Sequence, residues 1–369
     1  MKIGIDTLGL DHGQSGLGSY LFYLMKNLSP NDQIQYSLFG QEDDRYTYKA
    51  NFDTEYNAVD VSDSIKAQRW WHRFDCARFV RQQKYDVVFY CAASRMFPKK
   101  TGVKGIAVIN DIVSKLVEDE GDRYLSCKGL KYLRNACRII VPTQFVKNDL
   151  VQYGFSGDKI CVIPNGIDHN LFYPQNLSDS EYVDIKPFAI KRPYIIYPTR
   201  ISGADKNHIQ LIRAFNQFKK KTNLAHRLVL AGDHDSYAEQ VQKEILASPY
   251  ASDIFLTGFF PHKELGPLYS NADACIFPSA REGVGLPVLE MMACGVPVAC
   301  SCKGALPEVS GNNAVFFDPD NIDQIADSLE KILSDTNLRQ NLIQNGQKWA
   351  ASFTWKNTAL KIENLIAEL

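Results

Sequence analysis

Short apolar runs rich in β-branched and aromatic residues alternate with stretches of helical periodicity along the whole chain. This alternation is typical of parallel sheets whose strands are joined by crossover helices. In the first half the pattern predicts strands over residues 2–6, 34–39, 86–91, 105–109, 137–141 and 159–163. It predicts helices there over residues 19–28, 64–84, 127–135 and 143–153, the last capped by Thr143 and ended by Gly154.

The second half shows the same alternation. The predicted strands cover residues 194–198, 227–231, 253–256, 273–277, 296–299 and 314–317. The predicted helices cover residues 206–221, 236–247, 262–270, 287–294, 321–334 and 338–352. Between the halves, residues 174–193 contain three prolines and no strong period, which indicates a linker.

These patterns predict an α/β protein of two Rossmann-like, doubly wound domains that face each other across a cleft. We expect an N-terminal domain over residues 1–180, a C-terminal domain over 181–350, and a helix over 351–369 that crosses back to the N-terminal domain. Ligands of doubly wound sheets bind beyond the carboxyl ends of the strands. The expected site is therefore the cleft between the two domains.

Composition and charge narrow the class of protein. The chain has 369 residues, 45% of them hydrophobic, and 41 basic against 42 acidic side chains. The balanced charge gives no reason to expect a nucleic-acid partner. Nine scattered cysteines, several inside apolar runs, suggest a reducing cytoplasm. We expect neither a signal peptide nor a membrane span, because the first residues read as a strand and the most apolar stretch, 285–302, contains Glu290 and two prolines.

Two carboxylates bracket a glycine-containing turn that follows the predicted strand at 273–277. Glu282 precedes the turn formed by Gly283, Val284, Gly285 and Leu286, and Glu290 lies one helical turn beyond it. The glycines allow a ligand to approach the backbone, and the helix start favours a phosphate. Alone, each glutamate would be an ordinary loop or helix charge, but the apolar setting of Glu290 favours binding of a ribose diol.

A second pair of charged residues follows the strand at 194–198. Arg200 lies directly after the strand and Lys206 enters the next helix. An arginine fork and a lysine point charge together can neutralise a diphosphate. Read singly, both are surface charges of a strand–helix turn, and the signal comes from their combination with the two glutamates.

A third candidate is the glycine-rich segment 13–20 between the first strand and the first helix, which contains Gly16 and Gly18. It lacks the Gly-x-Gly-x-x-Gly spacing, and no P-loop occurs in the chain. A tight turn and a phosphate- or sugar-binding loop remain equal alternatives for it. His12, directly before this segment, is a further site candidate, whereas His208 and His262 are predicted to be helix caps or surface residues.

Together these residues resemble the retaining glycosyltransferases of family 4, which have the two-domain GT-B fold. The resemblance spans nearly the whole chain and rests on the Glu-x7-Glu spacing, the Arg-x5-Lys spacing, and the segments 162–168, 272–274, 277–279 and 293–298. It implies a nucleotide-diphosphate-sugar donor and no cofactor or metal. Mannose is slightly favoured among hexoses carried by GDP, UDP or dTDP, and a glycan or lipid-linked saccharide of surface polysaccharide or lipopolysaccharide biosynthesis is the implied acceptor.

The resemblance also implies roles for individual residues. Glu290 would bind the ribose, Glu282 with the backbone of 283–286 would bind the sugar, and Arg200 with Lys206 would bind the diphosphate, with Gly16 closing over it. Arg200, Lys206 and Glu282 are thus the implied catalytic residues, and the base would lie near residues 258–260.

One position departs from the family pattern. Many relatives have His-Asp after the strand at 105–109, where this chain has Asn110 and Asp111. Asparagine does not titrate, so no acid–base role carries over, although both residues stay candidates for the acceptor side. The departure also leaves one alternative function, a catalytically inactive sugar-nucleotide-binding protein.

The segment 66–84 interleaves arginines with aromatic residues. The favoured interpretation is a crossover helix that packs on the first sheet through a rough stripe of Trp70, Phe74, Ala77 and Val80. The alternative is peripheral contact with an anionic membrane surface on its cytoplasmic side.

Overall fold

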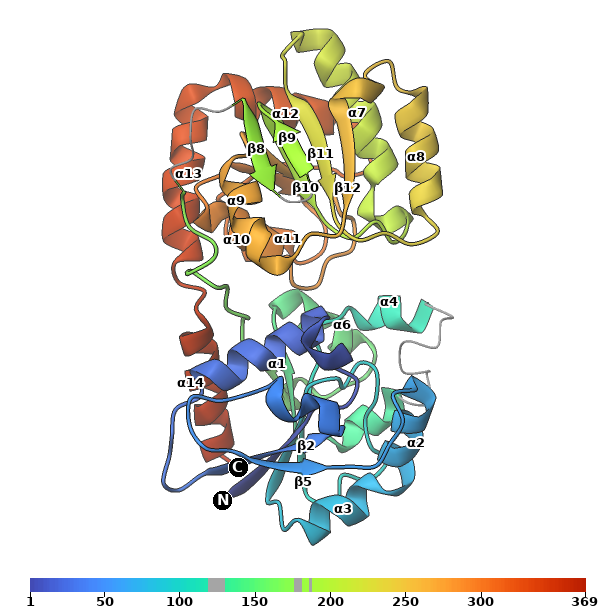
Figure 1. Ribbon diagram of the computed structural model, residues 1–369, viewed down its shortest axis with the longest axis vertical. Coiled ribbons are helices and arrows are strands. Elements are labelled where there is room, and N and C mark those ends of the chain that lie inside the picture. Colours follow the sequence, from blue (N-terminus) through green and yellow to red (C-terminus); the bar gives the residue numbers. More distant parts are fainter. Residues whose placement is uncertain (119–129, 176–180, 186–187) are drawn as a thin grey trace. The chain divides into compact units, whose positions relative to one another are not determined.

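The computed structural model describes residues 1–118, 130–175, 181–185 and 188–369, which divide into two compact units (Figure 1). Unit 1 consists of Met1–Gly166 together with Trp355–Leu369, and unit 2 consists of Ile167–Thr354. The first unit therefore ends before the expected boundary at residue 180. The last helix, far away in the sequence, belongs to unit 1.

Unit 1 is built on a sheet of seven described strands, all parallel, in the order β3-β2-β1-β4-β5-β6-β7. The strands are β1 (Lys2–Asp6), β2 (Gln35–Gly40), β3 (Glu55–Ala58), β4 (Val87–Tyr90), β5 (Lys104–Val108), β6 (Arg138–Val141) and β7 (Ile160–Val162). The strand order reverses between β1 and β4, as in a doubly wound fold. The sequence predicted six of these strands and missed β3, a short edge strand with no buried residue.

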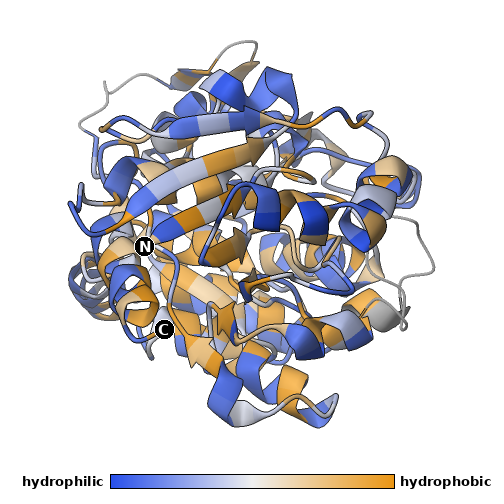
Figure 2. Ribbon diagram, turned by 90° about the horizontal axis from the view of Figure 1, so that it is seen from below, coloured by the Kyte–Doolittle hydropathy of each residue, from blue (hydrophilic) through white to orange (hydrophobic). Residues whose placement is uncertain are grey.

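Helices cover both faces of this sheet. They are α1 (Gly16–Asn27), α2 (Ile65–Phe74), α3 (Cys76–Gln82), α4 (Val113–Glu118), α6 (Gln144–Gln152) and α14 (Trp355–Ala367), with short 3-10 turns η1 (Asp11–Gly13), η2 (Glu42–Tyr46), η3 (Lys131–Asn135) and η4 (Gly157–Lys159). On one face α1 packs beside α14, where the rings of Tyr23 and Trp355 stack at 5.5 Å. Figure 2 shows the apolar residues gathered along the strands and the inner sides of these helices.

Two helix predictions in unit 1 were wrong in detail. The segment 64–84 is two helices that break at Asp75, and this change of direction turns Cys76 and Val80 of α3 into the core. Trp70 and Phe74 are 68% and 51% exposed rather than packed on the sheet. The predicted helix 127–135 is a 3-10 turn over Lys131–Asn135, and residues 127–129 lie outside the described part of the chain.

Unit 2 contains a second parallel sheet of six described strands in the order β12-β11-β10-β13-β14-β15. The strands are β10 (Tyr194–Pro198), β11 (Arg227–Ala231), β12 (Ile254–Gly258), β13 (Ala274–Phe277), β14 (Val298–Ser301) and β15 (Val315–Phe317). Their order is that of a Rossmann fold, and the reversal lies between β10 and β13. Every residue of β10, β13 and β14 is buried, which explains why the sequence marks them as continuous apolar runs.

The helices of unit 2 follow the predicted pattern within a few residues, except for the five-residue helix Leu306–Ser310, which the pattern did not predict. They are α7 (His208–Thr222), α8 (Ala238–Ala247), α9 (Leu265–Ser270), α10 (Leu286–Ala293), α11 (Leu306–Ser310), α12 (Ile322–Ser334) and α13 (Thr336–Ala350), with 3-10 turns η5 (Ala204–Lys206), η6 (Ala251–Asp253) and η7 (His262–Glu264). The pairs α7–α12 and α10–α13 pack closely against each other.

The predicted linker 174–193 is not simply a connecting segment. It contains two antiparallel strands, β8 (Tyr182–Ile185) and β9 (Phe188–Lys191), which pair with each other outside the main sheet. Val183 and Ile185 alternate with exposed residues on β8, so the short period-2 signal was present but was overlooked beside the prolines. Residues 176–180 and 186–187 of the linker lie outside the described part.

Candidate functional site

The charged residues singled out in the second half come together at the reversal point of the second sheet. Arg200 and Lys206 follow β10, whereas Glu282 and the turn 283–286 follow β13. Because β10 and β13 are adjacent parallel strands, both segments leave the sheet at the same carboxyl edge. This is the place where doubly wound sheets bind their ligands.

Lys206 and Glu282 form an ion pair in this site. The Lys206 Nζ atom donates a hydrogen bond to Glu282 Oε2 at 2.7 Å, and the two side chains are 12% and 19% exposed. Arg200 lies nearer to solvent, where its guanidinium is 3.5 Å from Asp233 and its side chain is 53% exposed. The site therefore holds one sequestered cation and one exposed cation beside a carboxylate.

Hydrogen bonds through the backbone hold the two segments of the site together. The Tyr197 hydroxyl donates to the Lys206 carbonyl at 2.9 Å, and the Ala280 amide donates to the Asp205 carbonyl at 2.8 Å. Asn207, buried and left-handed at φ 54°, donates from its side-chain amide to the carbonyls of Pro278 and Pro319. The sequence analysis missed Asn207, although asparagine directly before a helix is a recognised signal for such a backbone.

A third segment supports Glu282 from the other side. The Ala305 amide donates to the Glu282 carbonyl at 2.8 Å. Gly304 precedes it at φ 67°, and a Cβ atom built there would lie 2.9 Å from the Glu282 carbonyl oxygen. Only glycine fits this approach without a shift of the backbone, so Gly304 fixes the position of Glu282.

Glu290 projects from α10, which begins after the left-handed Gly285 and carries Pro287 in its first turn. Its side chain is half-buried, and no described residue makes a hydrogen bond or ion pair with its carboxylate. Burial raises the pKa of Glu290 to about 8. A carboxyl group held in an apolar setting without a protein partner is suited to bind ligand hydroxyls.

The prediction that His208 is a cap or surface residue was wrong. His208 is fully buried in the first turn of α7, with its ring 4.8 Å from that of Tyr197. Neither ring nitrogen has a hydrogen-bond partner among the described residues. Burial lowers the pKa of His208 to about 3, with a further contribution from Lys206. The His208 ring packs against the Tyr197 ring, whose hydroxyl donates to the Lys206 carbonyl.

The predicted base-binding segment has two different aromatic residues. Phe260 is 5% exposed and packs against Phe188 at 5.4 Å, so its ring is already used in the protein interior. Phe259 is 68% exposed and lies one residue after the left-handed Gly258. Only Phe259 presents a ring to solvent in this segment.

The remaining predicted residues lie in unit 1. Gly16 is the first residue of α1, and a Cβ atom there would meet nothing within 4 Å, so protein packing does not require a glycine. Asn110 lies past the end of β5, where its Oδ1 accepts a hydrogen bond of 3.4 Å from Asn165. Asp111 follows and is half-buried.

The described residues contain neither a metal-binding cluster nor a membrane-spanning helix. No group of three or more histidine, cysteine, aspartate or glutamate side chains among them is arranged to hold a metal ion. Within the same part of the chain, every helix is too short or too polar to span a bilayer.

Comparisons with known proteins agree with this architecture. The family model described as "Glycosyl transferases group 1" matches residues 179–349, and that described as "Glycosyltransferase Family 4" matches residues 14–171. An O-antigen chain mannosyltransferase B of Escherichia coli is 31% identical over 66% of this chain, and the serotype-specific mannosyltransferase WbdA of the same species is 25% identical over 86%. These matches span 63% and 40% of the lengths of those two proteins.

A solved structure of Anabaena Alr3699/HepE, in complex with UDP and glucose, matches with a TM-score of 0.74 at 18% identity and covers the full length of both chains. The two family models meet near the division between the units; one covers the second sheet, and the other covers the first sheet except for β1. The chain belongs to the group 1, family 4-like glycosyltransferases with the GT-B fold.

Proposed function

We propose that this chain transfers a hexose, with mannose favoured, from a nucleotide-diphosphate sugar to a glycan or lipid-linked saccharide acceptor in surface polysaccharide biosynthesis. The observation that carries the proposal is the Lys206–Glu282 ion pair at the reversal point of the second sheet, where Arg200 follows β10 and Glu290 lies on the helix after Glu282. The relatives named as mannosyltransferases support the choice of sugar. GDP-mannose is accordingly the first donor to test.

Each residue of the site has a role in this proposal. Glu290, which has no described protein partner, receives the ribose hydroxyls. Lys206 and Arg200 face the diphosphate, and the start of α10 adds its backbone amides. Glu282 and the turn 283–286 hold the sugar hydroxyls. When the diphosphate binds, the Lys206 ammonium lies between two anions, so its position depends on Glu282.

The proposed transfer retains the configuration of the sugar and uses no metal. The bond between the anomeric carbon and the phosphate oxygen breaks, the bond to the acceptor oxygen forms on the same face, and the acceptor proton passes to the leaving diphosphate. Lys206 and Arg200 stabilise the negative charge that grows on the diphosphate. In this proposal the two cationic side chains do what a metal ion would otherwise do. Anomeric analysis of the product by NMR tests retention, and turnover in excess EDTA tests metal independence.

The central experiment compares donor binding with transfer. Thermal stabilisation by GDP-mannose, UDP-glucose and related donors identifies the nucleotide, because a bound donor raises the melting temperature by mass action. Transfer is then measured with a panel of saccharide acceptors. Glu290→Gln is expected to lose the stabilisation by donor, whereas Glu239→Gln on the exposed side of α8 retains it. Donor binding without transfer to any acceptor would instead support the inactive sugar-nucleotide-binding protein.

The proposal includes contact with the membrane that would carry a lipid-linked acceptor. Trp70 and Phe74 are exposed on α2 with their rings 4.5 Å apart, and the Arg73 guanidinium lies 5.2 Å from the Phe74 ring. Exposed aromatic rings beside arginine suit the interface of an anionic bilayer. We expect the protein to sediment with phosphatidylglycerol vesicles but not with phosphatidylcholine vesicles. Loss of this sedimentation in Trp70→Ala would support the proposed membrane contact.

A further inference from the structure

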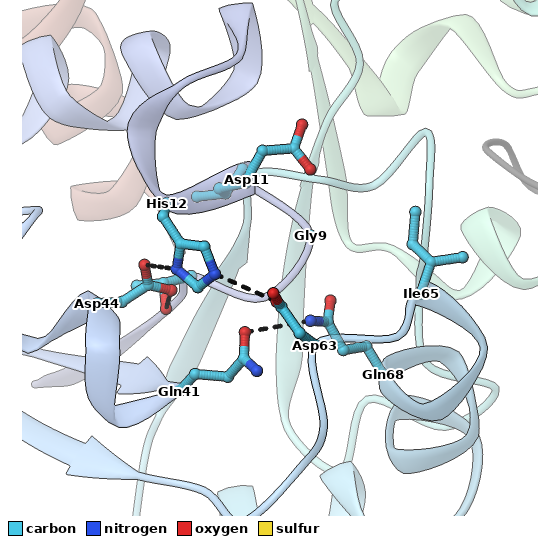
Figure 3. A pocket seen from close by; sticks show the side chains of 10 residues that line it. Gly9, Asp11, His12, Gln41, Asp44, Asp63, Ile65 and Gln68 are labelled. Carbon is cyan, nitrogen blue, oxygen red and sulfur yellow. Dashed lines mark hydrogen bonds and ion pairs between the residues drawn. The ribbon is translucent and has the colours of Figure 1, made fainter.

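Unit 1 contains a polar pocket that the proposed donor site does not use. It lies beyond the carboxyl ends of β1, β2 and β3, and Figure 3 shows the side chains that line it. Its volume is about 80 Å³. A single water needs only ~10–15 Å³ on the same measure, so the pocket has room for a larger polar group.

Gln68 supplies the strongest sign of a ligand. Its side chain is 3% exposed and lines the pocket from α2. The Nε2 atom donates to Gln41 Oε1 at 3.2 Å, but the Oε1 atom has no hydrogen-bond partner among the described residues. A buried amide oxygen without a donor is destabilising, because it has given up its hydrogen bonds to water. A ligand that donates a hydrogen bond to this oxygen would restore the missing interaction.

The opposite wall is held in a strained conformation. Asp11 and His12 are consecutive non-glycine residues with φ of 51° and 50°. The His12 ring bridges Asp44 Oδ1 at 2.8 Å and Asp63 Oδ1 at 3.1 Å (Figure 3). Such a backbone persists where surrounding contacts fix it, and it clusters at binding sites. Here the two carboxylates fix His12, and Arg95 holds Asp11 at 2.6 Å.

The lining is rich in hydrogen-bond acceptors. Asp11 is paired with Arg95, and Asp44 already accepts hydrogen bonds from Thr7 and His12. The cationic groups beside these carboxylates, Arg95 and His12, are already paired with them, so the pocket is unsuited to the phosphates of the donor.

The acceptors left for a ligand are the Gln68 amide oxygen and the second oxygen of the exposed Asp63 carboxylate. They suit a neutral group with several hydroxyl donors, as a sugar has, because carboxylates and amide oxygens accept hydroxyl hydrogen bonds well.

We infer that this pocket binds one hydroxyl-rich sugar unit of the acceptor, with Gln68 Oε1 and the Asp63 carboxylate accepting its hydroxyl hydrogen bonds. The identification of that sugar as part of the acceptor rests on the proposed function. The binding of a sugar in the pocket is independent of the proposed function, because it is inferred from the lining residues alone.

The test uses saturation-transfer NMR on the full chain with a panel of methyl glycosides: the α-methyl glycosides of mannose, glucose, galactose and N-acetylglucosamine. At least one is expected to receive saturation from the protein. The saturation-transfer signal should fall at least threefold in Gln68→Met and in Asp63→Asn. The Asp63 side chain is 74% exposed, so we expect its replacement to leave the fold intact. Asp60→Asn, an exposed aspartate outside the pocket, is the matched control and should leave the signal unchanged.

Two further measurements separate the possible failures. Thermal stabilisation by GDP-mannose should be equal in the wild type and all three variants, which also shows that they are folded. In a transfer assay the pocket variants should raise KM for the acceptor and leave KM for the donor unchanged. The inference is overturned if no methyl glycoside is saturated, or if the signal persists in both pocket variants. If glycoside binding depends on the pocket but no transfer occurs, the inference stands and the proposed function fails.

Discussion

The ammonium group of Lys206 lies 2.7 Å from a carboxylate oxygen of Glu282, although 76 positions separate the two residues in the chain. One residue follows β10 and the other follows β13, so the pair closes the reversal point of the second sheet. Removing one partner leaves a sequestered charge without its counterion, which is more harmful than removing both.

A double-mutant cycle tests this coupling. Lys206→Met and Glu282→Gln are each expected to lower the free energy of unfolding by about 1–3 kcal/mol, and the double variant by clearly less than the sum. Urea denaturation of the four proteins measures the interaction. Additive losses would show that the contact contributes nothing to stability. Lys220→Met, an exposed lysine on α7, is the control for loss of a positive charge.

The two cations are expected to act mainly in the transition state, because charge on the diphosphate grows as the sugar leaves. Arg200→Met and Lys206→Met should lower kcat by about 10²–10³, the size typical of one lost electrostatic contact. Donor KM should change by less than about tenfold. Steady-state kinetics with GDP-mannose measures both constants. Equal losses in affinity and turnover would contradict this division.

Glu290 makes stability depend on pH in the neutral range. Its pKa is raised to about 8 from 4.5, so the folded chain binds the proton more tightly than the unfolded chain. The stabilisation is therefore complete below about pH 4.5 and is lost as the pH rises through 8. Glu290→Gln should remove this loss, so that the variant gains about 1–3 kcal/mol relative to the wild type between pH 5 and pH 9. Parallel pH profiles of the free energy of unfolding in the wild type and Glu290→Gln would refute this prediction.

His208 is expected to give the free energy of unfolding the opposite dependence on pH, with a loss of stability in acid. Its pKa is lowered to about 3 from 6.5, so the unfolded chain takes up the proton first. Stability is complete above about pH 6.5 and is lost as the pH falls toward 3. His208→Phe keeps a ring against Tyr197 and removes both unpaired nitrogens, and it should flatten the melting temperature between pH 4 and pH 6.5. A variant as acid-sensitive as the wild type would show that other groups dominate.

Gly304→Ala tests how Glu282 is positioned. The added Cβ would lie 2.9–3.0 Å from the Glu282 backbone, at a φ that disfavours side chains. We expect a loss of about 1–3 kcal/mol in stability and a raised KM for donor. In Gly157→Ala the new atom would meet only Val151, at 3.8 Å, so this variant should behave as the wild type. An unchanged KM for donor in Gly304→Ala would show that the loop containing Gly304 does not position Glu282 for donor binding.

Sequence reasoning placed Arg200, Lys206 and Glu282 at one edge of the second sheet because each follows a strand buried on both faces. The apolar runs of β10 and β13 mark where the sheet ends, and the next charged residues must lie at its carboxyl edge. The elements it missed are short and partly polar, such as β3 at the edge of its sheet and the β8–β9 pair.

Contacts between distant segments could not be predicted in the same way. The burial of His208 depends on its packing against Tyr197, and the role of Gly304 depends on the approach of a separate loop. The pocket of unit 1 combines residues from three connections after β1, β2 and β3, and none of Asp44, Asp63 or Gln68 belongs to a motif. Such sites are defined by tertiary structure, because their residues have no fixed spacing.

The helix α14 comes from the far end of the chain yet completes unit 1, whose Tyr20 and Tyr23 pack against Trp355. During translation the N-terminal segment therefore leaves the ribosome without its last helix, and unit 2 is synthesised in full before that helix emerges. Until then the apolar surface that α14 covers stays open, which makes nascent unit 1 a substrate for chaperones. A stop codon ahead of Trp355 would therefore remove part of the hydrophobic core of unit 1 and leave unit 2 intact.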